Sequence, residues 1–173
     1  LIYVLAAMER EGVRIDQQAL GDFSIQLVTD IKALEKTIYE KAGVRFNIAS
    51  PKQLGEVLFE KLQLDPKAKK TKTGQYQTGE DILTALASKS DIAKDILDFR
   101  QLQKLKSTYV DALPLLINPK TQRVHTSYNQ AVAATGRLSS NNPNLQNIPI
   151  KTERGREVRR AFIPRSDEFI IVS

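Results

Sequence analysis

The chain has 173 residues, of which 41% are hydrophobic and 27% charged, with a net charge of +6. These values are typical of a globular protein with one ordinary domain or two small ones. The absence of cysteine excludes disulfides and thiolate metal sites, and the sequence shows neither a membrane-spanning apolar run nor a signal peptide. We expect a cytoplasmic protein without a membrane partner.

The sequence begins and ends within apolar runs. The chain opens with the apolar run Leu1 to Leu5 instead of an initiator Met, and the apolar run Phe169 to Val172 stops at Ser173. We therefore expect the chain to be a piece cut from a longer protein.

A long helix is predicted to begin after Asp16, a residue type that caps helix N-termini. Its apolar residues follow one another at spacings of three and four, the pattern of one helix face. They are Phe23, Leu27, Ile31, Leu34 and Ile38. Gly43 stands where a C-terminal glycine would end this helix.

Short elements are predicted next. Ser50 and Gln53 have the spacing of a capping box, with a proline at the first helical position between them. The polar stretch 65–78, rich in Lys, Thr and Gly, is predicted to be a flexible loop. Another short helix is predicted over 80–87, with Thr78 as its N-cap.

A second long helix is predicted after Ser90, continuing towards Tyr109 and kinked or ended by Pro114. Its apolar face comprises Ile92, Ile96, Phe99, Leu102 and Leu105. The two long helices have similar lengths and flank the short ones. An antiparallel helical hairpin with a short-helix tip is therefore the expected arrangement.

The pattern changes near Asn118. A strand is predicted over 123–128, a turn-rich segment over 135–149, a short basic helix over 155–162 and a strand over 169–172. The predicted fold class is mainly α with a small β part of a few antiparallel strands.

The change in pattern also sets the predicted domain boundary, which divides residues 1–117 from 118–173. Residues 118–165 hold nine basic and two acidic side chains, whereas the rest of the chain has a net charge of −1. Such a concentration of positive charge favours a nucleic-acid partner, and a solvated basic surface is the alternative.

Two stretches carry a resemblance to a known family. The first is Lys-Leu-Lys-Ser-Thr-Tyr at 104–109, and the second runs from Ala-Thr-Gly-Arg-Leu-Ser-Ser at 134–140 to Pro-Asn-Leu-Gln-Asn-Ile-Pro at 143–149. Together they resemble the signature of family A DNA polymerases, the bacterial polymerase I group. The resemblance spans essentially the whole chain, because further matching segments occur at 8–16, 50–54 and 159–162.

The resemblance implies that residues 1–117 form a thumb lying along the minor groove of a primer–template duplex, and that residues 118–173 begin the palm. In the family, two palm aspartates hold magnesium ions. The sequence ends before the first of them and lacks the fingers helix that binds the incoming nucleotide. Asp167 and Glu168 are not expected to replace them, because adjacent residues on a strand point to opposite faces.

We therefore expect part of a DNA-directed DNA polymerase of replication and repair, catalytically inactive as an isolated fragment and without catalytic or metal-binding residues of its own. Mg²⁺ and deoxynucleoside triphosphates are expected only for the full-length enzyme. That enzyme is expected to be a cytoplasmic, nucleoid-associated monomer.

Arg137 follows Gly136, and a glycine allows the backbone to approach a ligand closely. A guanidinium can donate to the minor-groove acceptors that every base pair presents. In the family the matching arginine contacts the primer-terminal pair. The other predicted DNA contacts, from the same motifs and from the tip loop, are Lys72, Lys104, Lys106, Ser107, Thr108, Thr135, Ser139, Asn144, Gln146 and Asn147.

For several of these residues, a purely structural or solvent-exposed role is an alternative to a DNA contact. The lysines of the tip loop suit a solvated loop as well as phosphate contacts, and Ser139 and Ser140 suit local turn bonds as well as phosphate. Tyr109 is expected to pack between thumb and palm. His125, the only histidine, is expected to be structural, since a zinc site needs further ligands.

Two other functions stay open. The chain could be a non-catalytic basic helical module that coats DNA, or a scaffold whose helical hairpin binds a protein. Salt-dependent DNA binding would separate the scaffold from the other two. The sequence that flanks the chain in its parent would separate the module from the polymerase.

Overall fold

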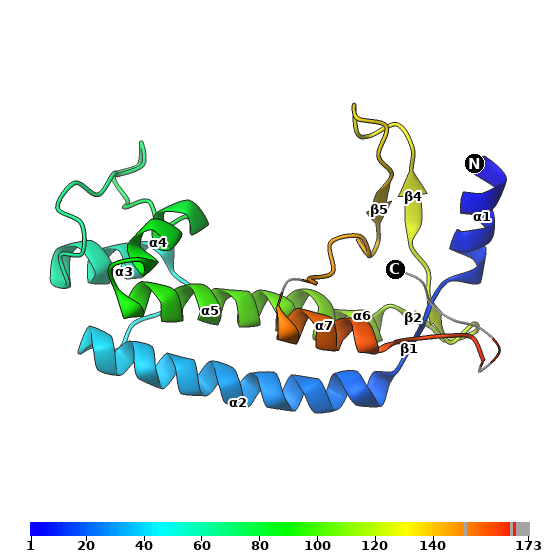
Figure 1. Cartoon of the computed structure of the whole chain (residues 1–173), viewed down its shortest axis with the longest axis horizontal. Helices are drawn as coiled ribbons and strands as arrows, with labels where there is room; N and C mark the ends of the chain where they lie inside the picture. Colours follow the sequence, from blue (N-terminus) through cyan, green and yellow to red (C-terminus); the bar gives the residue numbers. More distant parts are fainter. Residues whose placement is uncertain (151, 167, 169–173) are drawn as a thin grey trace. The chain divides into compact units, whose positions relative to one another are not determined.

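The computed structural model describes residues 1–150, 152–166 and 168 (Figure 1). They form two compact units, one of Leu1–Gln26 with Lys104–Ser173 and one of Leu27–Gln103. The long helices α2 (Gln17–Ala42) and α5 (Asp91–Leu105) each contribute residues to both units. No helix within these described ranges is long and apolar enough to cross a membrane.

The Leu27–Gln103 unit contains the predicted helical hairpin. Its portions of α2 and α5 run side by side in opposite directions (Figure 1). The apolar faces expected from the sequence are largely buried, with Leu27, Ile38 and Ile96 at 0% exposure, and Leu34 and Leu102 are half-buried. Near the tip, Lys41 Nζ lies 2.5 Å from an Asp95 carboxylate oxygen. The hairpin is therefore confirmed as an antiparallel pair that buries its two stripes.

The predicted ends of α2 are also confirmed. Asp16 Oδ1 accepts a hydrogen bond from the Ala19 amide at 2.9 Å, which supplies one of the helix's unpaired N–H groups with a partner. Gly43 follows the last helical residue with a φ of 63°, the left-handed conformation that terminates helices.

The tip of this unit comprises α3 (Pro51–Gly55), a π-helical stretch η1 (Glu56–Lys61) and α4 (Glu80–Ala87). Ser50 caps α3 by accepting from the Gln53 amide, as predicted. The Gln53 side chain, however, accepts from the Asn47 amide at 2.7 Å, so its expected role in a reciprocal capping box is taken by a bond to the preceding loop.

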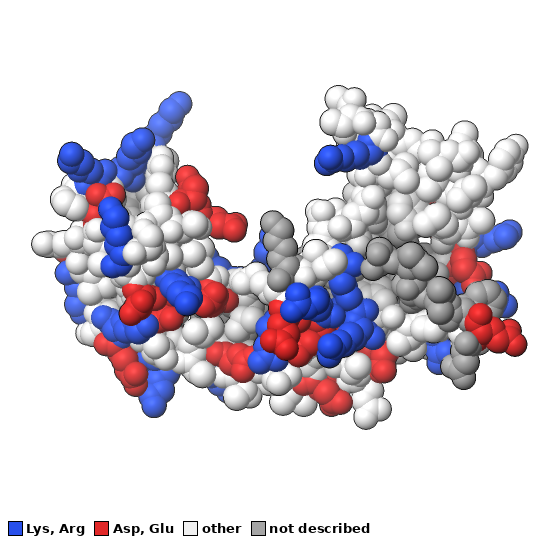
Figure 2. Space-filling model, viewed as in Figure 1, with Lys and Arg blue, Asp and Glu red and all other residues white. Residues whose placement is uncertain are grey.

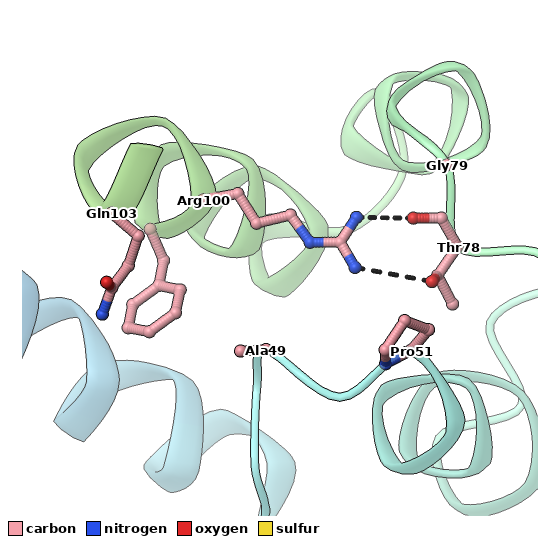
Figure 3. A pocket seen from close by; sticks show the side chains of 7 residues that line it. Ala49, Pro51, Thr78, Gly79, Arg100 and Gln103 are labelled. Atoms are coloured by element: carbon pink, nitrogen blue, oxygen red, sulfur yellow. Dashed lines mark hydrogen bonds between the residues drawn. The ribbon is translucent and has the colours of Figure 1, made fainter. Parts of the chain in front are cut away.

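The prediction that Thr78 caps α4 is wrong. Gly79 occupies the N-cap position without a side-chain bond, and Thr78 is only 6% exposed. Arg100 Nη1 donates to the Thr78 carbonyl at 2.5 Å, and Nη2 lies 3.4 Å from the Thr78 hydroxyl (Figure 3). The arginine holds both oxygens of Thr78, so the hydroxyl does not cap the helix.

The other unit contains α1 (Ile2–Glu11), η2 (Lys106–Val110), α6 (Ala112–Leu115) and α7 (Glu153–Arg160). Three antiparallel strand pairs accompany them. These are β1 (Arg14–Ile15) with β6 (Phe162–Ile163), β2 (Ile117–Asn118) with β3 (Arg123–Val124), and β4 (Ser127–Asn129) with β5 (Ser139–Asn141).

The strand predicted over 123–128 is interrupted and belongs to two separate pairs. At the break, the His125 ring nitrogens lie 2.8 Å from the Glu9 carbonyl oxygen and 2.7 Å from Thr121 Oγ1. Thr126 is buried, and its hydroxyl oxygen lies 3.0 Å from the Asn141 carbonyl oxygen. Hydrogen bonds from side chains thus replace the backbone hydrogen bonds between strands at this break. Both ring nitrogens of His125 have partners within the chain, which agrees with the structural role expected for it.

The short strands link distant parts of the sequence. The β1–β6 pair and the Val13–Val124 bridge bind the first residues of the chain into the unit that also holds residues 104–173. The predicted boundary between two domains near Asn118 was drawn from the change in composition, and it stays a prediction. The strand expected over 169–172 lies outside the described residues.

Candidate nucleic-acid interface

Two predicted contacts lie on the loop of the β4–β5 hairpin. The register pairs Asn129 with Ser139, which leaves residues 130–138 as the loop. Gly136 has a φ of 74°, and its amide donates to the Ala133 carbonyl at 3.0 Å. This turn presents Thr135 and Arg137, whose side chains are exposed. The glycine is needed for its backbone angle, because a Cβ there would meet no atom within 4 Å.

The two serines after this loop differ from each other. Ser140 is fully buried and its Oγ lies 2.6 Å from Thr126 Oγ1 and accepts from the Leu145 amide at 3.1 Å. Of the two interpretations left open for Ser140, the structure supports the local turn bonds. Ser139 Oγ is buried and has no hydrogen-bond partner among the described residues, so its contact with DNA stays a prediction.

The Pro143–Pro149 segment carries three further candidates, Asn144, Gln146 and Asn147, and all three are exposed. Asn144 Oδ1 accepts from the Gln146 amide at 3.0 Å, which closes a local turn. The Asn144 carboxamide oxygen is therefore used within the chain, and its NH₂ group remains a donor suited to the acceptor atoms of the minor groove.

The backbone of this segment is fixed by side chains from elsewhere. The Tyr109 hydroxyl donates to the Asn147 carbonyl at 2.5 Å. Arg159 of α7 donates to the Ile148 carbonyl at 3.1 Å and the Pro149 carbonyl at 3.4 Å. These three bonds could not be predicted from the sequence, because donor and acceptor are remote in the chain and no local pattern relates them.

A second group of candidates lies where α5 passes into the π-helical turn η2. Lys104, Ser107 and Thr108 are exposed. Lys106 is less available, because its ammonium lies 2.5 Å from an Asp111 carboxylate oxygen and its side chain is 21% exposed. Any contact of Lys106 with a phosphate would have to compete with this ion pair.

The third group lies in the tip of the Leu27–Gln103 unit. Figure 2 shows Lys and Arg side chains gathered over the loop between η1 and α4. Lys70 Nζ lies 4.2 Å from the centroid of the Tyr76 ring, and the hydroxyls of Thr71 and Thr73 are 2.8 Å apart. Lys72, between these threonines, is exposed.

Three arginines of the basic segment form ion pairs with acidic residues of the chain. Arg123 and Arg165 both pair with Glu11, and Arg154 pairs with Glu157 at 3.2 Å. The hydrogen bond from Arg123, together with the charges of nearby arginines, lowers the pKa of Glu11. The net charge of this segment therefore overstates the number of cations that can face a polyanion.

The pocket in Figure 3 has a volume of about 560 Å³ and belongs to the Leu27–Gln103 unit. Its walls include Pro51, Phe99 and Arg100. Burial lowers the pKa of Arg100, whose guanidinium is directed at Thr78. The pocket's cation thus fixes the turn before α4. None of the predicted contacts lies in this pocket.

The described residues do not fit a pair of magnesium ions. No group of three or more His, Asp or Glu side chains converges within residues 1–150, 152–166 and 168. Glu168 is exposed, and Asp167 lies outside these ranges.

Comparison with known proteins identifies close relatives. The model of "DNA polymerase family A" matches residues 17–173. The DNA polymerase I of Chloroflexus aurantiacus is 55% identical, over 94% of this chain and 18% of its own length. That of Geobacillus stearothermophilus is 52% identical, over 97% of this chain and 19% of its own length. The chain thus spans about a fifth of these relatives.

A solved structure is similar over nearly the whole chain. It is the polymerase domain of Pol1 from M. smegmatis, described as a complex with DNA primer-template and dNTP. The TM-score is 0.81 at 43% identity, over 92% of this chain and 28% of the other. The family match and these similarities show that the chain belongs to DNA polymerase family A.

Proposed function

We propose that this chain is part of a DNA-directed DNA polymerase of the polymerase I type. In that enzyme it would hold the primer–template duplex while deoxynucleotides are added during replication and repair. The observation that carries the proposal is the similarity, at 43% identity, to a polymerase domain described in complex with DNA primer-template and dNTP. We place the parent enzyme in the bacterial cytoplasm as a monomer.

Two kinds of DNA contact follow from the chemistry of the exposed residues. Lys72 and Lys104 are flexible point charges, suited to the phosphates of any sequence. Arg137 and the carboxamide donors of Asn144 and Asn147 suit the minor-groove acceptors shared by all base pairs. A polymerase needs both, because it must grip the duplex and check pair geometry without reading sequence.

Magnesium is proposed for the parent enzyme, and no group of three or more His, Asp or Glu side chains converges among the described residues of this chain. Phosphoryl transfer needs carboxylates around paired ions. We therefore expect the purified 173-residue chain to yield no product in a primer-extension assay. Extension that depends on a divalent cation and stops on addition of a chelator would contradict this expectation.

The role of Arg137 can be separated from that of the lysines in the full-length polymerase. If the Arg137 bond to the primer-terminal pair strengthens in the transition state, Arg137→Ala lowers the extension rate of the bound complex more than it weakens binding. A lost charged hydrogen bond is worth roughly 1.5–3 kcal/mol, so the rate should fall about ten- to a hundredfold. Single-turnover extension and equilibrium binding are measured for each variant.

Lys104→Ala and Lys72→Ala are the matched controls. They should weaken binding, leave the rate of the bound complex nearly unchanged and reduce the slope of log affinity against log salt by about 0.9 per lost phosphate contact. An Arg137→Ala variant that only weakens binding would make Arg137 another phosphate anchor. A parent that binds duplex but never extends a primer would favour the non-catalytic DNA-binding module.

A further inference from the structure

We propose that Tyr109 is a positioning residue that orients the Asn147 side chain for the duplex by holding the Asn147 carbonyl group. The inference rests on the proposed function, since it assumes that the Pro143–Pro149 segment contacts DNA. Tyr109 itself is buried and is not proposed to contact DNA. It acts only through the backbone of Asn147.

The first support is the irregular backbone of the Pro143–Pro149 segment. No helix or strand includes any of its residues, and only Ile148 is buried. Ordering a free segment of this kind costs backbone conformational entropy at every residue. Binding through its exposed side chains would be weak unless the segment were already fixed before DNA arrives.

Bonds to side chains at both ends of the segment supply this order. At its start, the Pro143 carbonyl accepts from Thr126 Oγ1 at 2.8 Å and Ser140 Oγ at 3.2 Å. At its end, Arg159 donates to the Ile148 and Pro149 carbonyls. Gly155 allows this approach, because a Cβ there would lie 2.6–3.0 Å from Pro149 atoms.

Tyr109 supplies the bond between these two ends. Its side chain is 6% exposed, and its hydroxyl lies 2.5 Å from the carbonyl oxygen of Asn147. Burial raises the pKa of Tyr109, so the hydroxyl stays protonated and able to donate at neutral pH. The side chain of Asn147 is therefore exposed, whereas its backbone carbonyl is held by a hydrogen bond from the buried Tyr109 hydroxyl.

A further support is that Tyr109 lies in the π-helical stretch η2. This stretch also holds the exposed Ser107 and Thr108. Departures from regular α-helix of this kind are frequent at functional sites. The buried ring packs within the unit while its hydroxyl reaches the Pro143–Pro149 segment, so one side chain connects two stretches that carry candidate contacts.

The test uses Tyr109→Phe in the full-length polymerase, which removes one oxygen and keeps the ring in the core. We expect the affinity for primer–template to fall about three- to tenfold, the scale of one hydrogen bond between neutral groups. Tyr39→Phe is the matched control. It also removes a tyrosine hydroxyl bond, to Glu35 at 2.9 Å in the other unit, and should leave affinity unchanged.

A double-mutant cycle distinguishes positioning from general stabilisation. Asn147→Ala removes the contacting side chain and keeps the carbonyl that Tyr109 holds. If Tyr109 acts through that side chain, Tyr109→Phe weakens binding no further in the Asn147→Ala background. A merely structural role would instead give equal losses in both backgrounds.

The outcomes separate this inference from the proposed function. Tyr109→Phe losses that add to those of Asn147→Ala, or a Tyr109→Phe variant with unchanged affinity, would overturn the positioning role and leave the duplex contact standing. An Asn147→Ala variant with unchanged affinity would overturn both the contact of this residue and the role of Tyr109.

Discussion

At the scale of single residues, Gly12 shows how one position allows the chain to pass between α1 and β1. Its φ is 64°, and a Cβ would lie 2.7 Å from the Val124 carbonyl oxygen and 2.8 Å from atoms of the His125 ring. The same histidine is bonded to the Glu9 carbonyl. A larger residue at position 12 would thus adopt an unfavourable backbone conformation and would also clash with Val124 and His125.

Gly12→Ala should therefore destabilise the fold by more than about 1 kcal/mol, because the left-handed backbone is unfavourable for alanine and the neighbours must also move. Gly74→Ala is the control, with a φ of 80° but no atom within 4 Å of the added Cβ. Urea denaturation gives the free energy of unfolding of both variants, and the difference between their losses is the cost of the clash at position 12. Equal losses of unfolding free energy would show that the backbone angle alone matters at Gly12.

Polar residues show where prediction from sequence reaches its limit at this scale. Asp16 is predictable as a cap from its residue type, and its partner, the Ala19 amide, is three residues away. Thr78 was assigned wrongly, because its partner Arg100 lies 22 positions further along the chain. The burial of Ser140 depends in the same way on Thr126, 14 positions earlier. Local hydrogen bonds can be predicted from spacing, whereas remote ones depend on the fold.

At the scale of elements, the long helices were predictable, whereas the helices α1 and α6 and most of the strands were not. The apolar repeat of α2 and α5 extends over several turns, so it determines both the helix and its buried face. The strands have two or three residues, too few for an alternating pattern. β1 and β6 were not predicted, and their pairing joins positions near the two ends of the chain.

The candidate interface divides in the same way. The exposed positions of Arg137, Asn144 and Asn147 agree with the motif, because turn-rich polar segments lie at the surface. The support from Tyr109 and Arg159 could not be predicted, since it comes from helices that the fold brings to this segment. The sequence thus indicates which residues can bind, and the structure adds what holds them.

At the scale of the whole molecule, candidate contacts occur in both compact units. The tip lysines belong to Leu27–Gln103, and the β4–β5 hairpin with the Pro143–Pro149 segment belongs to the other unit. Lys106, Arg123 and Arg165 are engaged in ion pairs within the chain. We therefore expect DNA affinity to depend on a limited set of exposed cations and amides more than on net charge.

Hydrogen–deuterium exchange of the full-length polymerase, with and without primer–template duplex, would locate the proposed DNA contacts directly. We expect slower amide exchange over 135–147 and over the tip loop at 67–72 when duplex is bound, because both segments would be covered and held by DNA. The middle of α2, already protected by its own hydrogen bonds, should change little. Unchanged exchange over 135–147 at saturating duplex would contradict the claim that this surface binds DNA.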